Sequence, residues 1–387
     1  MIKVLIIGIG NPIPSFIYRR LLALAKNGVK LTVVTEHGQE LRFMGADMVA
    51  INRKQNFIAF LISIRNILEM PLLLLKMLRI RKQLPWAQRV KWAIKYLSLL
   101  RIKTPDVIHV QWLGSVPDME WLKHFFSCPM VASARGSQVT VYPFTRPGYR
   151  ETIERAIQQV DYIHCVSNDI ANVCVELGAP KEKIRVNYNG IDLQKFFPAQ
   201  AKAKSTDSFV LISVGAMMWR KGFVYQLQVL KQLREKGDVR MLWVGEGTDR
   251  EALQYQAIKL GVADHVTFTG KVKTDELPSW LNQADVYIST SAAEGLANSV
   301  VEASACGLPV VAFACEGMEE VLEDGVSGFI LPFGDIEGLV TKIQLLMDKP
   351  ELRIQMANAA RQRMVEKFDE EKWVSHMIEI YKSIEKR

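Results

Sequence analysis

The chain has few cysteines, and they follow no pattern that would close disulfides or hold zinc. Its 387 residues contain five of them, and no two form a C-x-x-C pair (Cys128, Cys165, Cys174, Cys306 and Cys315). Disulfide frameworks use an even number of cysteines, and structural zinc sites use closely spaced pairs. This scarcity favours a reducing compartment, so we expect a cytoplasmic protein.

The sequence also lacks an uninterrupted apolar run of membrane length. The run Val4–Gly8 is short and leads into a further glycine, which indicates a buried strand in place of a signal peptide. Residues 57–75 reach about the length of a membrane span, but Arg65, Glu69 and Pro71 interrupt them. No internal repeat of solenoid period and no low-complexity tract is present.

Acidic residues are scarce in the first half of the chain. Residues 1–189 hold 26 Lys and Arg against 13 Asp and Glu, a net charge of +13, whereas the remainder holds 23 against 28, a net charge of −5. An asymmetry of this kind predicts an anionic partner for the first half. Nucleic acid, phospholipid head groups and phosphorylated acceptors all fit the charge alone.

The stretch 57–103 narrows that choice. Residues 70–105 carry nine Lys and Arg and no acid, with Trp86 and Trp92 interleaved. This composition is typical of basic amphipathic helices on an anionic membrane, although helices packed on a sheet with a solvated basic face are the alternative. We expect 57–103 to contact the inner face of the plasma membrane, and we expect no nucleic acid partner.

Short apolar runs rich in β-branched residues alternate with helical patterns along both halves. The alternation predicts two α/β domains with doubly wound parallel sheets, facing each other across a cleft at the carboxyl ends of their strands. The expected domains are 1–190 and 205–367, with 368–387 as a helix that crosses back to the first domain. The expected strands are Val4–Gly8, Leu31–Val34, Val107–Val110, Met130–Ser133, Tyr162–Val166, Ile184–Asn187, Phe209–Val214, Val239–Val244, Val266–Thr269, Val286–Ser289, Pro309–Phe313 and Gly328–Leu331.

The segment Ser291–Val311 carries the richest chemistry. Asn298 or Ser299 is expected to cap a short helix that finishes at Gly307, with Glu302 in its first turn and Glu294 on the preceding loop. The helix N-terminus suits phosphate oxygens, and a nearby carboxylate suits a ribose diol. Two structural alternatives stay open: Ser299–Glu302 is also a capping-box pattern, and Glu294 is equally an exposed loop acid.

The run Glu294-Gly-Leu-Ala-Asn-Ser-Val-Val-Glu302, continued as Ala-Ser-Ala-Cys-Gly-Leu-Pro-Val-Val311, resembles the signature of the family 4 retaining glycosyltransferases (glycosyltransferase group 1). The likeness is strong over about 180–335 and looser before it. It implies the GT-B arrangement, in which two Rossmann-like domains face an interdomain cleft. The further motifs that agree, in order, are Lys183–Asp192, Ser213–Gly215, Arg220–Gly222, Val244–Gly247, Phe268–Gly270, Ala284–Val286 and Glu319–Phe329.

The resemblance assigns roles in donor binding. Lys221 and Arg220 are expected to neutralise the diphosphate, because a compact ammonium suits a departing phosphate. Ala216 stands where the family usually has an arginine, which leaves Arg220 as the second charge. Glu302 is implied to hold the ribose and Glu294 to face the transferred sugar. The other implied donor contacts are Gly10, Gly215, Val272, Gly295, Leu296, Asn298, Ser299 and Val300.

The first half is expected to bind the acceptor. Gly8-Ile-Gly10-Asn11 follows the first strand and faces the cleft in the family; Ile13 replaces the third glycine of G-x-G-x-x-G, so no nicotinamide site is expected. Arg135-Gly136 stands where many relatives carry His-Gly near the sugar, and an arginine there favours an acidic or phosphorylated sugar or acceptor. His109 lies in an apolar strand and is expected to be a packed core histidine.

The expected reaction moves a sugar, with retention, from a UDP- or GDP-sugar to a hydroxyl of a lipid-linked or membrane-presented glycan, as in bacterial surface polysaccharide synthesis. No cofactor is expected and no metal, since no Asp-x-Asp motif occurs in a suitable place. Two alternatives remain. One is a sugar-nucleotide 2-epimerase on the same fold. The other, prompted by Ala216 and Arg135, is a catalytically degenerate glycan-binding subunit.

Overall fold

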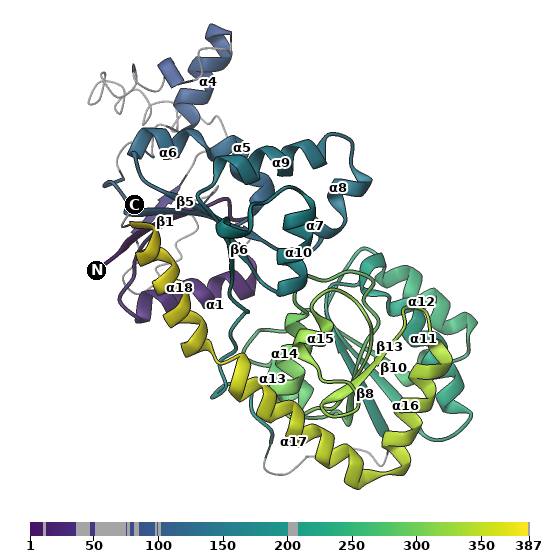
Figure 1. Cartoon of the computed structure of the whole chain (residues 1–387). Coiled ribbons are helices and arrows are strands. Elements are labelled where there is room, and N and C mark those ends of the chain that lie inside the picture. The colour runs from purple at the N-terminus through teal and green to yellow at the C-terminus, as the bar shows by residue number, and fades with distance from the viewer. Residues whose placement is uncertain are drawn as a thin grey trace.

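The chain folds into two α/β domains, one built from its first half and one from its second (Figure 1). The computed structural model describes residues 1–10, 13–35, 47–50, 75, 78–80, 85–96, 99, 102–199 and 208–385. Asn11 and most of the expected membrane segment 57–103 therefore lie outside the described residues. Within the described residues, no helix has the length and apolar character needed to cross a bilayer.

The first domain is built on a seven-stranded parallel sheet with the order β3-β2-β1-β4-β5-β6-β7. Order reverses between β1 and β4, and in doubly wound sheets the crevice beyond the strand ends at this point binds ligands. The helices of the domain are α1 (Ser15–Lys26), α4 (Trp86–Tyr96), η2 (Leu113–Ser115), α5 (Val116–Met119), α6 (Trp121–Phe126), α7 (Ser137–Thr140), α8 (Tyr142–Thr145), α9 (Tyr149–Gln159), α10 (Asn168–Glu176) and η3 (Lys181–Lys183). The strands are β1 (Lys3–Ile7), β2 (Lys30–Thr35), β3 (Asp47–Ala50), β4 (Val107–Val110), β5 (Met130–Ala134), β6 (Tyr162–Cys165) and β7 (Ile184–Val186).

The second domain repeats the scheme with a six-stranded parallel sheet in the order β10-β9-β8-β11-β12-β13, so its reversal lies between β8 and β11. Its strands are β8 (Phe209–Val214), β9 (Val239–Val244), β10 (Val266–Gly270), β11 (Val286–Ser289), β12 (Val310–Phe313) and β13 (Gly328–Leu331). Its helices are η4 (Trp219–Lys221), α11 (Phe223–Arg234), α12 (Arg250–Lys259), η5 (Ala263–His265), α13 (Leu277–Leu281), α14 (Asn298–Ala305), α15 (Met318–Val321), α16 (Ile336–Asp348) and α17 (Pro350–Lys367).

Both sheets form because their strands are nearly continuous apolar runs with both faces covered by helices. Strand β4 is buried at all four positions, and so is β11. Parallel sheets read this way because their crossover helices shield both faces from water. The expectation of two doubly wound domains is confirmed.

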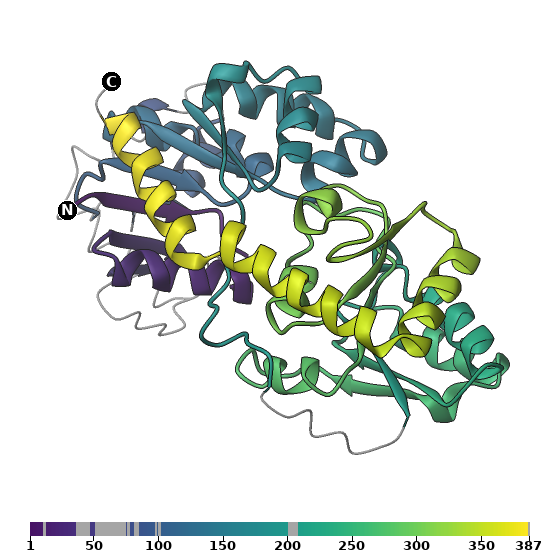
Figure 2. The ribbon, with the colours of Figure 1, turned by 60° about the horizontal axis from the view of Figure 1, so that its bottom comes forward.

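The last helix, α18 (Glu370–Glu385), leaves the second domain and packs on the first (Figure 2). Its residues Trp373, Met377 and Tyr381 are buried in one core cluster with residues of α1 and of β1. The chain crosses between domains at two points that bond to each other: Ile191 N–H donates to Phe368 O (2.7 Å), and Glu370 N–H donates to Ile191 O (3.1 Å).

Candidate donor and acceptor site

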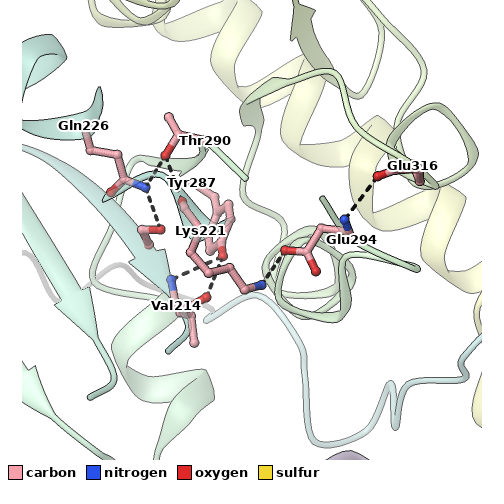
Figure 3. A network of polar contacts seen from close by, with 8 residues as sticks. Val214, Lys221, Gln226, Tyr287, Thr290, Glu294 and Glu316 are labelled. Atoms are coloured by element: carbon pink, nitrogen blue, oxygen red, sulfur yellow. Dashed lines mark hydrogen bonds and ion pairs between the residues drawn. The ribbon is translucent and has the colours of Figure 1, made fainter. Parts of the chain in front are cut away.

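The loop after β8 is held against the end of β11. Gly222 has φ +63°, and a Cβ there would lie 2.1 Å from Thr290 O, so only glycine fits this approach. The Thr290 hydroxyl donates to Gly222 O (2.9 Å). It accepts from Gln226 Nε2 (3.0 Å), a contact that Figure 3 shows. These bonds fix the backbone that carries Lys221 at the point where strand order reverses.

Lys221 and Glu294 meet in this crevice as an ion pair (Figure 3). The Lys221 side chain passes over Gly215, whose Cβ position lies 3.5 Å from Lys221 Cε. Glu294 is 7% exposed, and its N–H donates to Glu316 Oε2 (3.3 Å). The interpretation of Glu294 as an exposed loop acid is therefore wrong.

Helix α14 begins differently from the expectation. Its N-cap is Ala297, without a side-chain hydrogen bond, so neither Asn298 nor Ser299 caps it. Glu302 is the fifth helical residue and lies one turn in, beyond the first turn, and it forms no capping box. The N–H groups of Val300 and Val301 donate to Ala297 O, so those of Asn298 and Ser299 are the ones that can bind an anion. The expected end is confirmed, because α14 stops at Ala305 and Gly307 follows with φ +69°.

Two contacts join α14 to the first domain. Glu302 Oε1 accepts from Arg19 Nη2 at 2.5 Å, and the two side chains are 9% and 21% exposed. Asn298 Oδ1 accepts from Asn189 Nδ2 at 2.7 Å. Glu302 is thus a buried carboxylate paired across the domain boundary, and helix capping does not account for it.

Arg135-Gly136, at the end of β5, lies directly against the Glu294 loop. A Cβ on Gly295 would lie 2.3 Å from Gly136 N, so the two backbones touch, and Ser167 Oγ donates to Gly295 O (2.6 Å). Gly136 has φ +43°, which a side chain would strain. The structure therefore brings the expected acceptor-side pair beside the expected donor-side motif.

The Arg135 guanidinium is buried. Its Nη2 donates to Gln111 Oε1 (3.2 Å) and to Ser133 Oγ (3.0 Å), and its Cζ lies 5.6 Å from the Phe16 ring centroid. Burial lowers the pKa of Arg135 to about 10. The group stays charged at neutral pH, yet it has left the solvent that would stabilise that charge.

His109 is a buried core histidine, as expected, and it belongs to a hydrogen-bond chain under Arg135. Tyr381 O–H lies 2.6 Å from His109 Nδ1, and His109 Nε2 lies 2.8 Å from Ser133 Oγ. Ser133 Oγ lies 2.9 Å from His164 Nδ1, and His164 Nε2 lies 3.0 Å from Asn187 O. That final carbonyl only accepts, so with both imidazoles neutral every donor in the chain points from Tyr381 toward Asn187.

A cavity of about 840 Å³ opens between α1, residues 192–195 and the loop 271–275. It contains Val272 and Arg19, and its size suits a nucleotide. A second cavity of about 770 Å³ lies at the amino ends of β5 and β6, lined by Pro129 and Asp161. Ligands of doubly wound sheets bind at the carboxyl ends, so the first cavity is the candidate site.

The remaining residues that were expected to bind the donor differ in how far they are buried. Leu296 and Val300 are buried, and Ser299 is half-buried at the start of α14. Gly10 is exposed after β1, and Ala216 is exposed in the loop after β8. Arg220 is half-buried, and among the described residues no ion pair involves it. The sequence analysis did not predict a role for Arg19 and Arg20 of α1. An arginine within a helix carries no local pattern that would indicate a partner almost 300 residues away, as Glu302 is from Arg19.

The comparisons with known proteins agree with this geometry. Residues 14–195 match the family profile described as Glycosyltransferase Family 4, and residues 195–363 match Glycosyl transferases group 1. N-acetyl-α-D-glucosaminyl L-malate synthase of Bacillus anthracis is 29% identical over 259 residues, 65% of this chain and 67% of that protein. Lipopolysaccharide core biosynthesis glycosyltransferase LpsE of Rhizobium meliloti is 27% identical over 285 residues, 73% and 77% of the two chains.

Among solved structures, Anabaena HepE in complex with UDP superposes with a TM-score of 0.76 at 17% identity, covering 99% of this chain and 100% of that one. The two facing doubly wound domains define a protein of the GT-B class. With both halves matching, the chain belongs to the group 1 glycosyltransferases of family 4.

Proposed function

We propose that the protein transfers a sugar, with retention, from a nucleoside diphosphate sugar to a hydroxyl of a lipid-linked or membrane-presented glycan. The observation that carries the donor half is the uncapped N-terminus of α14 together with the half-buried Lys221 ammonium, which pairs with Glu294 on the loop that leads into this helix. Backbone N–H groups and an ammonium together form an anion site in a crevice largely removed from water. HepE, a structural neighbour of the same fold, was solved in complex with UDP, and this supports a nucleotide-sugar donor for the present chain.

Donor binding would exchange partners at both ion pairs. Lys221 would leave Glu294 for the diphosphate, freeing the Glu294 carboxylate for hydroxyls of the transferred sugar. Glu302 would leave Arg19 for the ribose diol, beside the cavity that holds Val272. Carboxylates accept such hydroxyl bonds readily. Arg220, in the same loop, would add the second positive charge.

The chemical step breaks the bond between the anomeric carbon and the leaving phosphate oxygen and forms one to the acceptor oxygen. The acceptor proton passes to the departing diphosphate. Lys221, Arg220 and the N–H groups of α14 stabilise the charge that develops on that diphosphate, and positioning of the two substrates supplies the rest. The Glu294–Glu302 pair is not a glycosidase pair, because Glu302 serves the nucleotide.

A thermal-shift screen against UDP-, GDP- and ADP-sugars tests the donor half, because a ligand that binds only the native state raises the melting temperature by mass action. We expect a shift with UDP- or GDP-sugars that is lost in Glu302→Gln. No shift with any of them contradicts the proposal. Release of an epimerised nucleotide sugar without acceptor would instead favour the epimerase.

The acceptor half rests on the basic, apolar segment 57–103 and on the relative LpsE, whose name places it in lipopolysaccharide core biosynthesis. We place the protein in the cytoplasm, on the inner face of the plasma membrane, within surface polysaccharide synthesis. Vesicles containing anionic lipid should bind the protein, less so at high salt and after charge reversal at Arg79, Arg81 and Lys82. Binding that ignores both changes would exclude this membrane contact.

A further inference from the structure

Unpartnered polar atoms gather around one aromatic ring, that of Phe16. Arg20 Cζ lies 5.2 Å and Arg135 Cζ 5.6 Å from its centroid, and Arg20 Cζ also lies 5.7 Å from the ring of Trp373. Within the described residues, the buried atoms without a hydrogen-bond partner include Arg20 Nη1, Arg135 Nε and Nη1, and Trp373 Nε1. All four are N–H donors. Buried donors are normally satisfied, so this cluster lacks an acceptor.

Within the described residues, Glu370 is the one carboxylate whose charge acts on the two arginines, and it acts on Arg20 alone. No carboxylate among the described groups acts appreciably on Arg135, whose pKa is lowered mainly by burial. Burial and then the Arg135 charge lower the pKa of Arg20 well below its usual range, with only Glu370 opposing. Two buried guanidinium groups, one of which lowers the pKa of the other, are costly unless an anion joins them.

The position of Arg135 in the cleft indicates that a substrate would supply the missing anion. Arg135 directly precedes Gly136, whose backbone touches Gly295 next to Glu294. Its Nη2 is already held by Gln111 and Ser133, so the side chain is fixed while its Nε and Nη1 remain free. A fixed guanidinium with free N–H groups suits a carboxylate, which accepts more than one of them at once.

We propose that Arg135, with Arg20 beside it, binds a carboxylate on the sugar being transferred or on the acceptor, so that the substrate contains an acidic sugar of the hexuronic kind. This inference rests on the proposed function, since it places the carboxylate within the same cleft. In this proposal Arg20, from α1, and Arg135, at the end of β5, determine the class of substrate. Both residues lie outside the donor motif.

Entry to this subsite is coupled to the donor. On the Arg20 side of the subsite, Phe16, Arg20 and both members of the Arg19–Glu302 pair line a cavity of about 10 Å³, room for one water; Arg135 is not among its lining residues. In the proposed donor complex Glu302 turns to the ribose, which breaks the pair and opens the cavity. The subsite should therefore bind its anion more tightly once the nucleotide is bound.

The test compares ligands that differ only in the carboxylate at C6. In the donor arm, calorimetry measures UDP-glucose against UDP-glucuronate and GDP-mannose against GDP-mannuronate. In the acceptor arm, free glucuronate is compared with glucose, with and without UDP or GDP. We expect the acid to bind about 10- to 100-fold more tightly in one arm, the range of a charge-assisted hydrogen bond. The arm that shows the preference identifies the source of the carboxylate.

Arg135→Met should abolish the preference while UDP affinity and melting temperature stay near wild type, because an uncompensated buried charge adds no stability. Arg135→Lys should keep part of the preference. Arg353→Met, which removes another arginine stacked on a ring, outside the cleft, should keep all of it. A preference absent from both arms, or unchanged in Arg135→Met and Arg135→Lys, overturns the subsite. Failure of every nucleotide to bind refutes the donor proposal separately, because the free-sugar arm without nucleotide still judges Arg135.

Discussion

At the scale of single residues, both carboxylates of the donor motif have cationic partners. Glu294 pairs with Lys221 inside its own domain, and Glu302 pairs with Arg19 from the other domain. A buried carboxylate without a partner is strongly unfavourable, so these ion pairs allow Glu294 and Glu302 to stay ionised inside the folded protein. In the proposed donor complex, Lys221 exchanges Glu294 for the diphosphate, and Arg19 is released when Glu302 binds the ribose.

Replacing Lys221 with methionine removes the ammonium and keeps the length of the side chain. We expect turnover to fall by about 10²- to 10³-fold, because a preorganised charge beside a leaving group contributes on that scale. The free energy of unfolding should also fall, since Glu294 loses its partner. Steady-state kinetics with the donor found in the screen and urea denaturation measure the two effects.

The matched control is Lys123→Met. Lys123 is a half-buried lysine paired with Asp161 at 2.7 Å, near the amino ends of the strands. Its loss should change stability modestly and leave turnover intact, because it is remote from the crevice. Equal loss of turnover in both variants would show that general destabilisation, and not the charge at Lys221, accounts for the effect.

At the scale of elements, hydrophobic periodicity in the sequence predicted the buried strands. It did not predict features that depend on contacts between residues far apart in the chain. All six strands of the second sheet were expected, since each is a buried apolar run. Strand β3 (Asp47–Ala50) was not, because four residues at a sheet edge carry too little pattern. The start of α14 was misassigned because Asn298 favours an N-cap, whereas its amide instead bonds to Asn189 of the other domain. Local propensity cannot register such a contact.

The chain of buried side chains from Tyr381 through His109 and Ser133 to His164 ties α18 to three neighbouring strands. Burial lowers the pKa of His109 to about 3, with Arg135 and Arg20 adding to the effect, and it lowers that of His164 well below its usual range. Both imidazoles are therefore neutral in the folded protein. This neutrality lets Ser133 accept from Arg135 and holds its guanidinium in place.

The depressed pKa of His109 makes stability depend on pH. The unfolded chain takes up a proton near pH 6.5, whereas the folded chain does so only near pH 3, so stability is full above 6.5 and is lost as pH falls toward 3. The loss reaches about 1.4 kcal/mol per pH unit within that window. His109→Gln should shift the urea midpoint of unfolding at every pH. It should also make that midpoint depend less steeply on pH between pH 6 and 4. His376→Gln, at an exposed site, should leave this pH dependence unchanged.

At the scale of the whole molecule, a group of hydrogen bonds between α15 and the start of α10 joins the two domains. The Glu320 carboxylate of α15 accepts from Asn168 N (2.8 Å), Asn168 Nδ2 (2.8 Å) and Asp169 N (3.0 Å) at the start of α10. In return, Asp169 Oδ2 accepts from Gly317 N (2.7 Å). A carboxylate at a helix N-terminus is further favoured by the helix dipole, so the Glu320 charge contributes to holding the two domains together.

Replacing Glu320 with glutamine removes that charge and one acceptor while keeping the shape of the side chain. Hydrogen bonds to charged groups contribute about 1.5–3 kcal/mol, and partial exposure reduces this, so we expect the open form to gain about 5- to 30-fold in population. Small-angle scattering should then report a larger radius of gyration, and the KM for the donor should rise, since both domains contact it. Glu319→Gln changes the exposed neighbouring carboxylate and should alter neither quantity. If Glu320→Gln matches Glu319→Gln in both measurements, the Arg19–Glu302 pair and the shared packing of α18 are sufficient to keep the cleft closed.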